Sequence, residues 1–283
     1  MKTIREVLSL STTYLKDRNI TNPRREAEDL LCDALHLKRV ELYMDIDRPL
    51  TEKELTLCRE RLARRAKGEP LAYIHGEVDF ADCRIVVNPF VLIPRPETEL
   101  LVERVANALK DVDLTGMVLW DLCCGSGCIG IALKKKFPAL KVEMSDISPE
   151  AVLVAKSNAE ANEVDITIHH GDLFAPFADR KCHYFVCNPP YISEHEYGTL
   201  SREVLDHEPR LALVAELDGY AFYDRIAREL PLFLQPGAQV WLELGYQQGP
   251  KVKELFGEWH SVAVDKDYSG HDRFVHVTLS SKP

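Results

Sequence analysis

The stretch Met117-Val118-Leu119-Trp120-Asp121-Leu122 runs directly into Cys123-Cys124-Gly125-Ser126-Gly127-Cys128-Ile129-Gly130. The first six residues are mostly apolar and predict a buried strand. The glycines that follow permit a sharp turn and let the backbone approach a ligand closely. A helix is expected from there to Lys136. A strand, a glycine-rich loop and a helix in this order predict an α/β unit that binds a ligand at its strand end.

The rest of the C-terminal two-thirds repeats this alternation of strands and helices. Further strands are expected at Lys141–Met144, Ile166–His169, Tyr184–Cys187, Ala238–Leu244, His260–Asp265 and Arg273–Leu279. Ser148 and Pro149 are suited to open the helix after the second strand. The pattern predicts an α/β fold with a doubly wound, Rossmann-like sheet whose last strand is antiparallel.

The N-terminal residues 1–72 have helical periodicity and predict a small helical bundle. Thr51 and Glu54 form a capping-box pattern at the start of one of its helices. Residues 73–94 are expected to be a β-hairpin linker, with extended segments at 73–76 and 84–87. The α/β domain would then occupy residues 95–283, with Thr98 capping its first helix.

Composition restricts the possible partners. The chain has 283 residues and a net charge of −10, from 35 Lys and Arg against 45 Asp and Glu. Binding to a long duplex needs clustered positive charge, so stable nucleic-acid binding is not expected. No apolar run is long enough to cross a bilayer and no signal peptide is evident, so we expect a cytoplasmic protein without a membrane partner.

The chain contains eight cysteines, none of them in a paired C-x2-C spacing. A zinc ribbon is therefore not supported. Small buried thiols in a reducing compartment are the better interpretation, and we expect no metal site.

A second distinctive stretch is Asn188-Pro189-Pro190-Tyr191, directly after the strand that ends at Cys187. Asn188 offers a carbonyl and an amide, and the two prolines fix the backbone without donating hydrogen bonds. Tyr191 adds a flat ring with a polar tip. This rigid corner suits a planar group that carries an NH2, such as an amide or the exocyclic amine of a base. A simple strand-to-loop turn is the alternative.

The cofactor is suggested by residues at the other strand ends. Gly125–Gly130 matches G-x-G-x-x-G, so a dinucleotide remains possible. Asp146, at the end of the next strand, is placed to accept both hydroxyls of a ribose. S-adenosylmethionine needs the same two features and a group for the adenine amine, for which Asp172 is suited, with Leu173 against the ring. A methyl donor, unlike a hydride donor, would also use the immobilised NH2 beside Asn188.

Together these motifs resemble class I S-adenosylmethionine-dependent methyltransferases that act on amide or exocyclic nitrogen. More specifically, Gly68–Ile74, Leu92–Glu99, Glu208-Pro209, Asp218-Gly219 and Lys266–Phe274 are similar to the peptide chain release factor glutamine methyltransferases. The resemblance covers nearly the whole chain. It departs at Cys123, where the family's loop has glycine, and at Leu173, where many relatives have tryptophan.

The resemblance implies a role for each matching residue. S-adenosylmethionine, with S-adenosylhomocysteine as its product, would be bound by Asp121, Cys123, Cys124, Gly125, Ser126, Gly127, Asp146, Asp172, Leu173 and Asn188. The substrate glutamine, from the Gly-Gly-Gln loop of a class 1 release factor, would be held by the catalytic residues Asn188, Pro189, Pro190 and Tyr191. Residues 1–72 would recognise the substrate, and residues 95–283 would form the methyltransferase domain.

Four other functions remain open from the sequence. The glycine pattern allows an NAD-dependent oxidoreductase, and the Asn-Pro-Pro-Tyr motif allows methylation of a ribosomal protein glutamine or of a nucleic-acid base. A release factor or ribosome binding module with a degenerate pocket would use no chemistry at all. A comparison of binding to NADH and to S-adenosylhomocysteine distinguishes the first of these from a methyltransferase.

Overall fold

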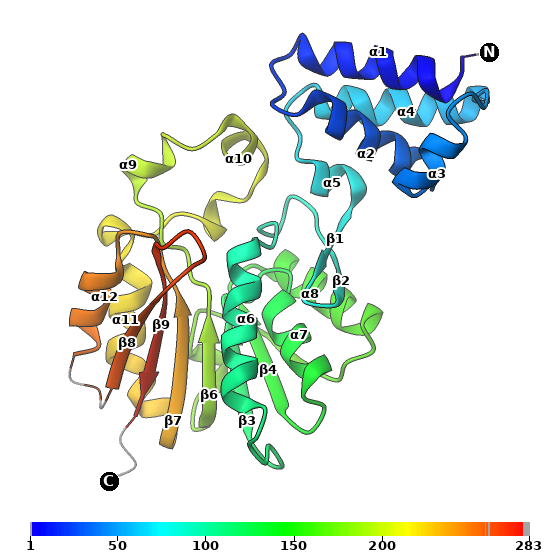
Figure 1. Ribbon diagram of the computed structural model, residues 1–283. Coiled ribbons are helices and arrows are strands. Elements are labelled where there is room, and N and C mark those ends of the chain that lie inside the picture. Colours follow the sequence, from blue (N-terminus) through cyan, green and yellow to red (C-terminus); the bar gives the residue numbers. More distant parts are fainter. Residues whose placement is uncertain (1, 258, 260, 280–283) are drawn as a thin grey trace. The chain divides into compact units, whose positions relative to one another are not determined.

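The computed structural model describes residues 2–257, 259 and 261–279 (Figure 1). These residues fall into two compact units. The first runs to Gly76 and includes Ser201–His207, and the second comprises Glu77–Leu200 and the described residues from Glu208 onward. The domain boundaries expected at residues 72 and 94 stay a prediction.

The first unit is helical, as the sequence predicts. Its helices are α1 (Ile4–Lys16), α2 (Pro23–Leu35), α3 (Arg39–Met44), α4 (Glu52–Arg65), α5 (Leu71–His75) and, from the distant segment, α10 (Arg202–His207). Thr51 and Glu54 form the expected capping box at the start of α4. Arg65 pairs with both Glu26 of α2 and Glu203 of α10, at 2.5 and 2.9 Å, which ties the distant segment to the bundle.

A two-stranded hairpin begins the second unit, but its first strand starts later than predicted. Residues 73–75 belong to α5, and the strands are β1 (Glu77–Phe80) and β2 (Cys83–Val86). The prediction of an extended segment at 73–76 is therefore wrong. The pattern of residues 71–75 fits a helical turn as well, and Gly76 ends that turn with a φ of 83°.

The second unit is built on a seven-stranded sheet in the order β5-β4-β3-β6-β7-β9-β8. Its strands are β3 (Val118–Leu122), β4 (Lys141–Asp146), β5 (Thr167–His170), β6 (Cys182–Cys187), β7 (Leu234–Glu243), β8 (Ser261–Lys266) and β9 (Asp272–Thr278). The five neighbouring strands β5, β4, β3, β6 and β7 are parallel to one another. Strand β9 is antiparallel to both of its neighbours, β7 and β8. The predicted Rossmann-like sheet with an antiparallel last strand is confirmed. His260, expected to begin β8, lies outside the described residues.

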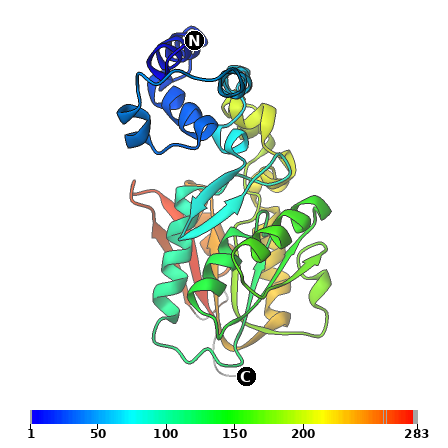
Figure 2. The same cartoon turned by 90° about the vertical axis from the view of Figure 1, so that its right-hand side faces the viewer.

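Helices cover both faces of this sheet. They are α6 (Pro96–Leu109), α7 (Cys128–Lys136), α8 (Pro149–Ala161), α11 (Ala221–Glu229) and α12 (Gly249–Leu255), whereas the short α9 (Glu194–Tyr197) lies beyond the strand ends, in the segment after β6 (Figure 1). Trp120 of β3 packs in one core with Tyr223 of α11, whereas the adjacent Asp121 accepts a hydrogen bond from the Gly130 N–H of α7. Because successive strand residues point to opposite faces, α7 and α11 lie on opposite sides of the sheet. Figure 1 and Figure 2 show that α8 lies beside α7, on the same side of the sheet.

The start of α6 differs from the prediction. The helix begins at Pro96, and its N-cap residue Arg95 makes no side-chain capping bond. Thr98 lies inside the first turn, where its hydroxyl donates to Glu243 instead of capping the helix. The prediction of Thr98 as a cap is wrong, because a tertiary partner takes its hydroxyl. Among the helices described, none combines the length and apolar character required to cross a membrane.

Candidate active site

A cavity of about 210 Å³ lies where β3, β4, β5 and β6 end. Its lining includes nine of the residues expected to form the site: Cys123, Cys124, Gly125, Ser126, Asp146, Asp172, Leu173, Asn188 and Pro190. Four expected residues do not line it: Asp121, Gly127, Pro189 and Tyr191. The carboxyl ends of parallel strands meet at one edge of the sheet, which explains why segments far apart in sequence converge here.

The glycine-rich loop after β3 is shaped by left-handed backbone. Gly125 has a φ of 52° and lines the cavity, and a Cβ added there would meet no atom within 4 Å. Cys123 has a φ of 56°, a conformation that glycine adopts without strain. The departure from the family's glycine at this position therefore leaves the loop geometry in place at some conformational cost.

The other two glycines of the G-x-G-x-x-G pattern serve packing. A Cβ at Gly127 would come within 3.0 Å of the terminal methyl of Met144, and one at Gly130 would overlap the Met144 sulfur. These glycines let α7 approach β4 closely. The pattern is thus accounted for without a pyrophosphate.

Asp146 stands at the end of β4 with its carboxylate at the cavity. Oδ2 accepts from the Gly125 N–H at 2.8 Å and Oδ1 accepts from the Ser148 N–H at 2.9 Å. Burial raises the pKa of Asp146, and these backbone donors oppose the rise. Each carboxylate oxygen has two acceptor positions, so one on each oxygen remains for a ligand hydroxyl.

Asp121 lies beneath the loop rather than at the cavity surface. It is fully buried, its Oδ2 accepts from the Gly130 N–H at 2.9 Å, and its Oδ1 has no hydrogen-bond partner among the described residues. Burial raises its pKa to about 8. The hydrogen bond from Gly130 shows that Asp121 supports the loop. Direct contact of Asp121 with a cofactor stays a prediction.

Asp172 and Leu173 close the β5 side of the cavity. Asp172 is half exposed and its Oδ1 accepts from Arg225 Nη1 at 3.0 Å. Leu173 is buried, has a φ of 42° and lines the cavity. The ion pair fixes one carboxylate oxygen of Asp172 and leaves the other for a donor.

Asn188 directly follows β6 and lines the cavity. Its Nδ2 donates to Thr98 Oγ1 at 3.3 Å, and its Oδ1 accepts no hydrogen bond from the described residues. Thr98 in turn donates to the buried Glu243 at 2.8 Å. Pro189 is buried outside the lining, whereas Pro190 lines the cavity beside Asn188. The acceptor of the Asn188 carboxamide is thus the atom free to meet a ligand.

Tyr191 is held through its backbone. Its carbonyl accepts from Gln248 Nε2 at 2.9 Å, and burial raises the pKa of its phenol. Its ring packs against the core that contains Tyr223. Tyr191 is partly buried and does not line the cavity.

Gly219→Ala is expected to lower stability by roughly 2–4 kcal/mol, because φ at Gly219 is 88° and a Cβ there would overlap the Tyr191 carbonyl oxygen. Urea unfolding measures this loss. Gly116→Ala is the matched control, because Gly116 has a φ of 76° and a Cβ there would meet no atom within 4 Å. Equal losses in the two variants would contradict the overlap with Tyr191.

Several residues that position this site received no structural role from the sequence, including Glu208, which was singled out only for its similarity to the family. Glu243 ends β7, so the rule that strand ends carry polar site residues would have found it. Glu208 is buried and accepts from the Ile93 N–H at 3.2 Å and from Arg95, which fixes the proline-rich loop. Buried Asn158 donates to the Ser126 carbonyl at 2.9 Å. No local signal in the sequence marks these last two contacts.

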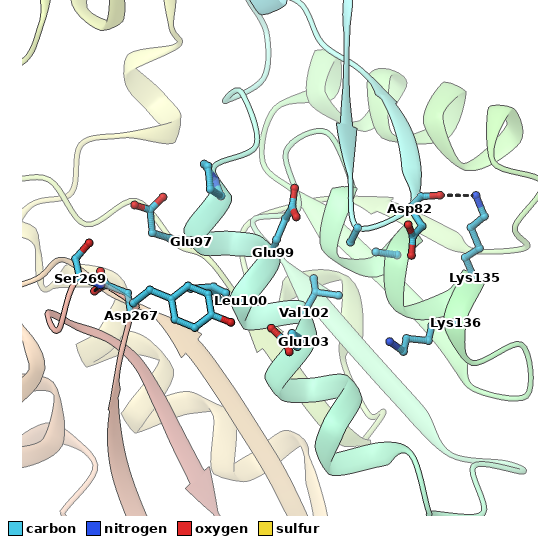
Figure 3. A pocket seen from close by; sticks show the side chains of 14 residues that line it. Asp82, Glu97, Glu99, Leu100, Val102, Glu103, Lys135, Lys136, Asp267 and Ser269 are labelled. Atoms are coloured by element: carbon cyan, nitrogen blue, oxygen red, sulfur yellow. Dashed lines mark hydrogen bonds between the residues drawn. The ribbon is translucent and has the colours of Figure 1, made fainter.

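A larger cavity, of about 740 Å³, lies elsewhere in the second unit (Figure 3). Acidic side chains of α6, including Glu97, Glu99 and Glu103, lie on one side of it, and Lys135 and Lys136 on the other. Lys135 donates to the Asp82 carbonyl at 2.9 Å. None of the expected site residues lines this cavity. Among the described residues there is also no cluster of His, Cys, Asp and Glu that could hold a metal ion.

Comparison with known proteins identifies the family. Residues 6–76 match the PrmC N-terminal domain, and residues 96–215 match the methyltransferase small domain. A release factor glutamine methyltransferase of Chlamydia trachomatis serovar L2 is 41% identical over 276 residues, covering 96% of this chain and 92% of the relative. One from Geobacter sulfurreducens is also 41% identical, covering 96% and 95%. The chain belongs to the release factor glutamine methyltransferase family.

Membership in this family confirms the resemblance inferred from the sequence, and it makes the chain a methyltransferase. It favours methyl transfer over the NAD-dependent alternative. A crystal structure of a methyltransferase from Pyrococcus furiosus has a TM-score of 0.53 with 19% identity, covering 78% of this chain and 98% of that one. That likeness supports the methyltransferase fold of this family member.

Proposed function

We propose that the protein transfers a methyl group from S-adenosylmethionine to the side-chain amide nitrogen of the glutamine in the Gly-Gly-Gln motif of peptide chain release factors. The observation that carries this proposal is the placement of Asn188, with a free carbonyl oxygen, in the same cavity as the Gly125 loop and Asp146. The near full-length similarity to proteins named release factor glutamine methyltransferase supports the substrate.

The residues of the cavity fit S-adenosylmethionine. Asp146 retains an acceptor position on each oxygen for the two ribose hydroxyls. Gly125 leaves open space in the cavity that a side chain at this position would occupy. Leu173 supplies an apolar wall and Asp172 an acceptor for the adenine amine. When bound, the cofactor supplies an electrophilic methyl group on a sulfonium sulfur. Asp121 would contribute by supporting the loop from below.

The amide nitrogen of glutamine is a poor nucleophile because its lone pair is delocalised into the carbonyl. We propose that Asn188 Oδ1 accepts one of its N–H groups and that a backbone carbonyl of the Pro189–Pro190 segment accepts the other. The two acceptors hold the nitrogen in one orientation and favour the positive charge that develops on it. The surplus proton then leaves to water, so the protein needs no dedicated general base. Packing of Tyr191 on the glutamine stays a prediction.

The remaining expectations follow from this function. We propose that residues 1–72 recognise the body of the release factor and that the protein acts in the cytoplasm, where release factors work. The net charge of −10 disfavours stable binding to nucleic acid.

Mass spectrometry of a release factor, after incubation with the protein and S-adenosylmethionine, tests the proposal. We expect one added methyl on the glutamine of the Gly-Gly-Gln motif, located by fragmentation. A release factor whose motif glutamine is replaced by alanine is the control and should gain none. Methylation at any other residue, or of a ribosomal protein in preference to release factor, would contradict the proposed substrate.

A further inference from the structure

Beside the cavity lies a buried carboxylate to which the mechanism above assigns no role. Glu243 ends β7, and its side chain is 1% exposed. Its backbone is fixed by the Tyr223 hydroxyl, which donates to the Glu243 carbonyl at 2.9 Å. Burying a carboxyl group is costly unless it is hydrogen-bonded, so its position invites a functional explanation.

Glu243 interacts with the Asn188 side chain directly and also through the Thr98 hydroxyl. Thr98 Oγ1 lies 2.8 Å from Glu243 Oε2 and 3.3 Å from Asn188 Nδ2. Thr98 is itself 3% exposed and sits in the first turn of α6. Three residues from three separate elements therefore form one chain of hydrogen bonds that ends at the proposed substrate-binding carboxamide.

The available donors and acceptors determine which group donates in each of these hydrogen bonds. An ionised carboxylate only accepts, so the single hydroxyl hydrogen of Thr98 must point to Glu243. The Thr98 oxygen can then only accept from Asn188, which selects the NH2 group for that side. The carboxamide carbonyl of Asn188 is forced to the opposite side. Without this constraint, an asparagine side chain can present either its oxygen or its NH2 to a ligand.

We propose that Glu243 and Thr98 are positioning residues that fix the Asn188 carboxamide with its oxygen toward the substrate. The inference rests on the proposed function, because the fixed oxygen is the one assigned to accept the glutamine N–H. An Asn188 turned the other way would present NH2 to the NH2 of the substrate, which cannot form that bond.

Protonation of Glu243 would remove the constraint. Burial raises the pKa of Glu243 to about 7, while the Thr98 and Asn188 contacts and Arg273 oppose the rise. A protonated Glu243 can donate to Thr98, which frees the Thr98 hydrogen for the Asn188 oxygen. Turnover should therefore decline as pH falls through about 7. Other titratable or charged groups that interact with Glu243 are Glu97, Cys128, Tyr191, Tyr223 and Arg273.

Three variants test the positioning role. Thr98→Val removes the hydroxyl at constant shape and should lower the turnover number about tenfold to 100-fold, with affinity for S-adenosylhomocysteine within twofold of wild type. Thr98→Ser keeps the hydroxyl and should restore most of the turnover. Glu243→Gln should lower turnover and abolish the decline below pH 7, because its side chain no longer titrates.

A second measurement does not depend on methyl transfer. In nitrogen-15 NMR spectra of the protein without cofactor, the side-chain NH2 signals of Asn188 are assigned by their loss in Asn188→Asp. Hydrogen exchange of this NH2 should be slow in wild type and in Thr98→Ser, and faster in Thr98→Val. This readout tests the hydrogen-bond chain separately from the proposed function. If the wild-type protein does not methylate release factor, the proposed function is refuted, but hydrogen exchange at Asn188 still tests the hydrogen-bond chain.

Unchanged turnover in Thr98→Val, or unchanged exchange of the Asn188 NH2, would overturn the inference. So would a purely structural outcome, in which Thr98→Val and Thr98→Ser lose thermal stability and cofactor affinity together and the pH profile of Glu243→Gln matches that of wild type.

Discussion

Asn188→Ala should lower the turnover of glutamine methylation by about 100-fold to 1,000-fold, while affinity for S-adenosylhomocysteine stays near that of wild type. The carboxamide of Asn188 is half-buried in the cavity, and its free oxygen is the acceptor proposed for the substrate N–H. Removing it leaves the amide nitrogen free to rotate away from the methyl donor. Steady-state kinetics on release factor and calorimetry with S-adenosylhomocysteine measure the two quantities.

Asn107→Ala is the matched control, since Asn107 is an exposed asparagine of α6 outside this cavity and should leave both quantities unchanged. Asn188→Ala also deprives Thr98 of a donor, so its thermal stability must be checked beside its activity. Full turnover in Asn188→Ala would refute the assignment of this residue. A parallel loss of cofactor affinity would mean that Asn188 acts mainly on the cofactor.

Asp146→Ala should weaken the binding of S-adenosylmethionine at least about 100-fold. Hydrogen bonds to a charged group contribute about 1.5–3 kcal/mol each, and the proposed contact has two. The substitution also removes the acceptor for the Gly125 and Ser148 N–H groups, which loosens the loop that lines the cavity. Isothermal calorimetry measures the loss of affinity.

An analogue of S-adenosylhomocysteine without ribose hydroxyls separates the two effects of Asp146→Ala. If Asp146 binds the ribose, wild type should bind the analogue weakly. Asp146→Ala should then weaken binding of the analogue much less than it weakens binding of S-adenosylhomocysteine. Asp165→Ala, at an exposed carboxylate outside the cavity, should change neither. An unchanged affinity of Asp146→Ala for S-adenosylmethionine would contradict the ribose assignment.

The departures from the family pattern acquire a physical meaning in the structure. Cys123 adopts the left-handed backbone conformation for which glycine is suited, so the loop keeps its course without the glycine. Leu173 is also left-handed and lines the cavity, so an apolar wall persists where many relatives carry tryptophan. Cys123 keeps the backbone N–H and C=O that glycine would offer, whereas Leu173 lacks the indole N–H of tryptophan.

Where the sequence predictions were wrong, a short segment carried a weak local signal. The pattern of residues 73–76 is compatible with a strand or a helix, and α5 forms there instead. Thr98 precedes an evident helix and has the side chain of a cap, but the helix starts two residues earlier, at Pro96. In both cases local propensity is a weak preference that the tertiary surroundings override.

The sequence by itself determined the sheet, the glycine loop and the Asn-Pro-Pro-Tyr corner, because strand periodicity, left-handed turns and proline geometry are properties of a few adjacent residues. It also placed the polar residues at strand ends, since parallel strands share one edge. Only the tertiary structure decided that Asp121 and Tyr191 do not line the cavity. It alone also joined Thr98, Asn188 and Glu243, because strand order and helix packing bring together side chains that no local pattern relates.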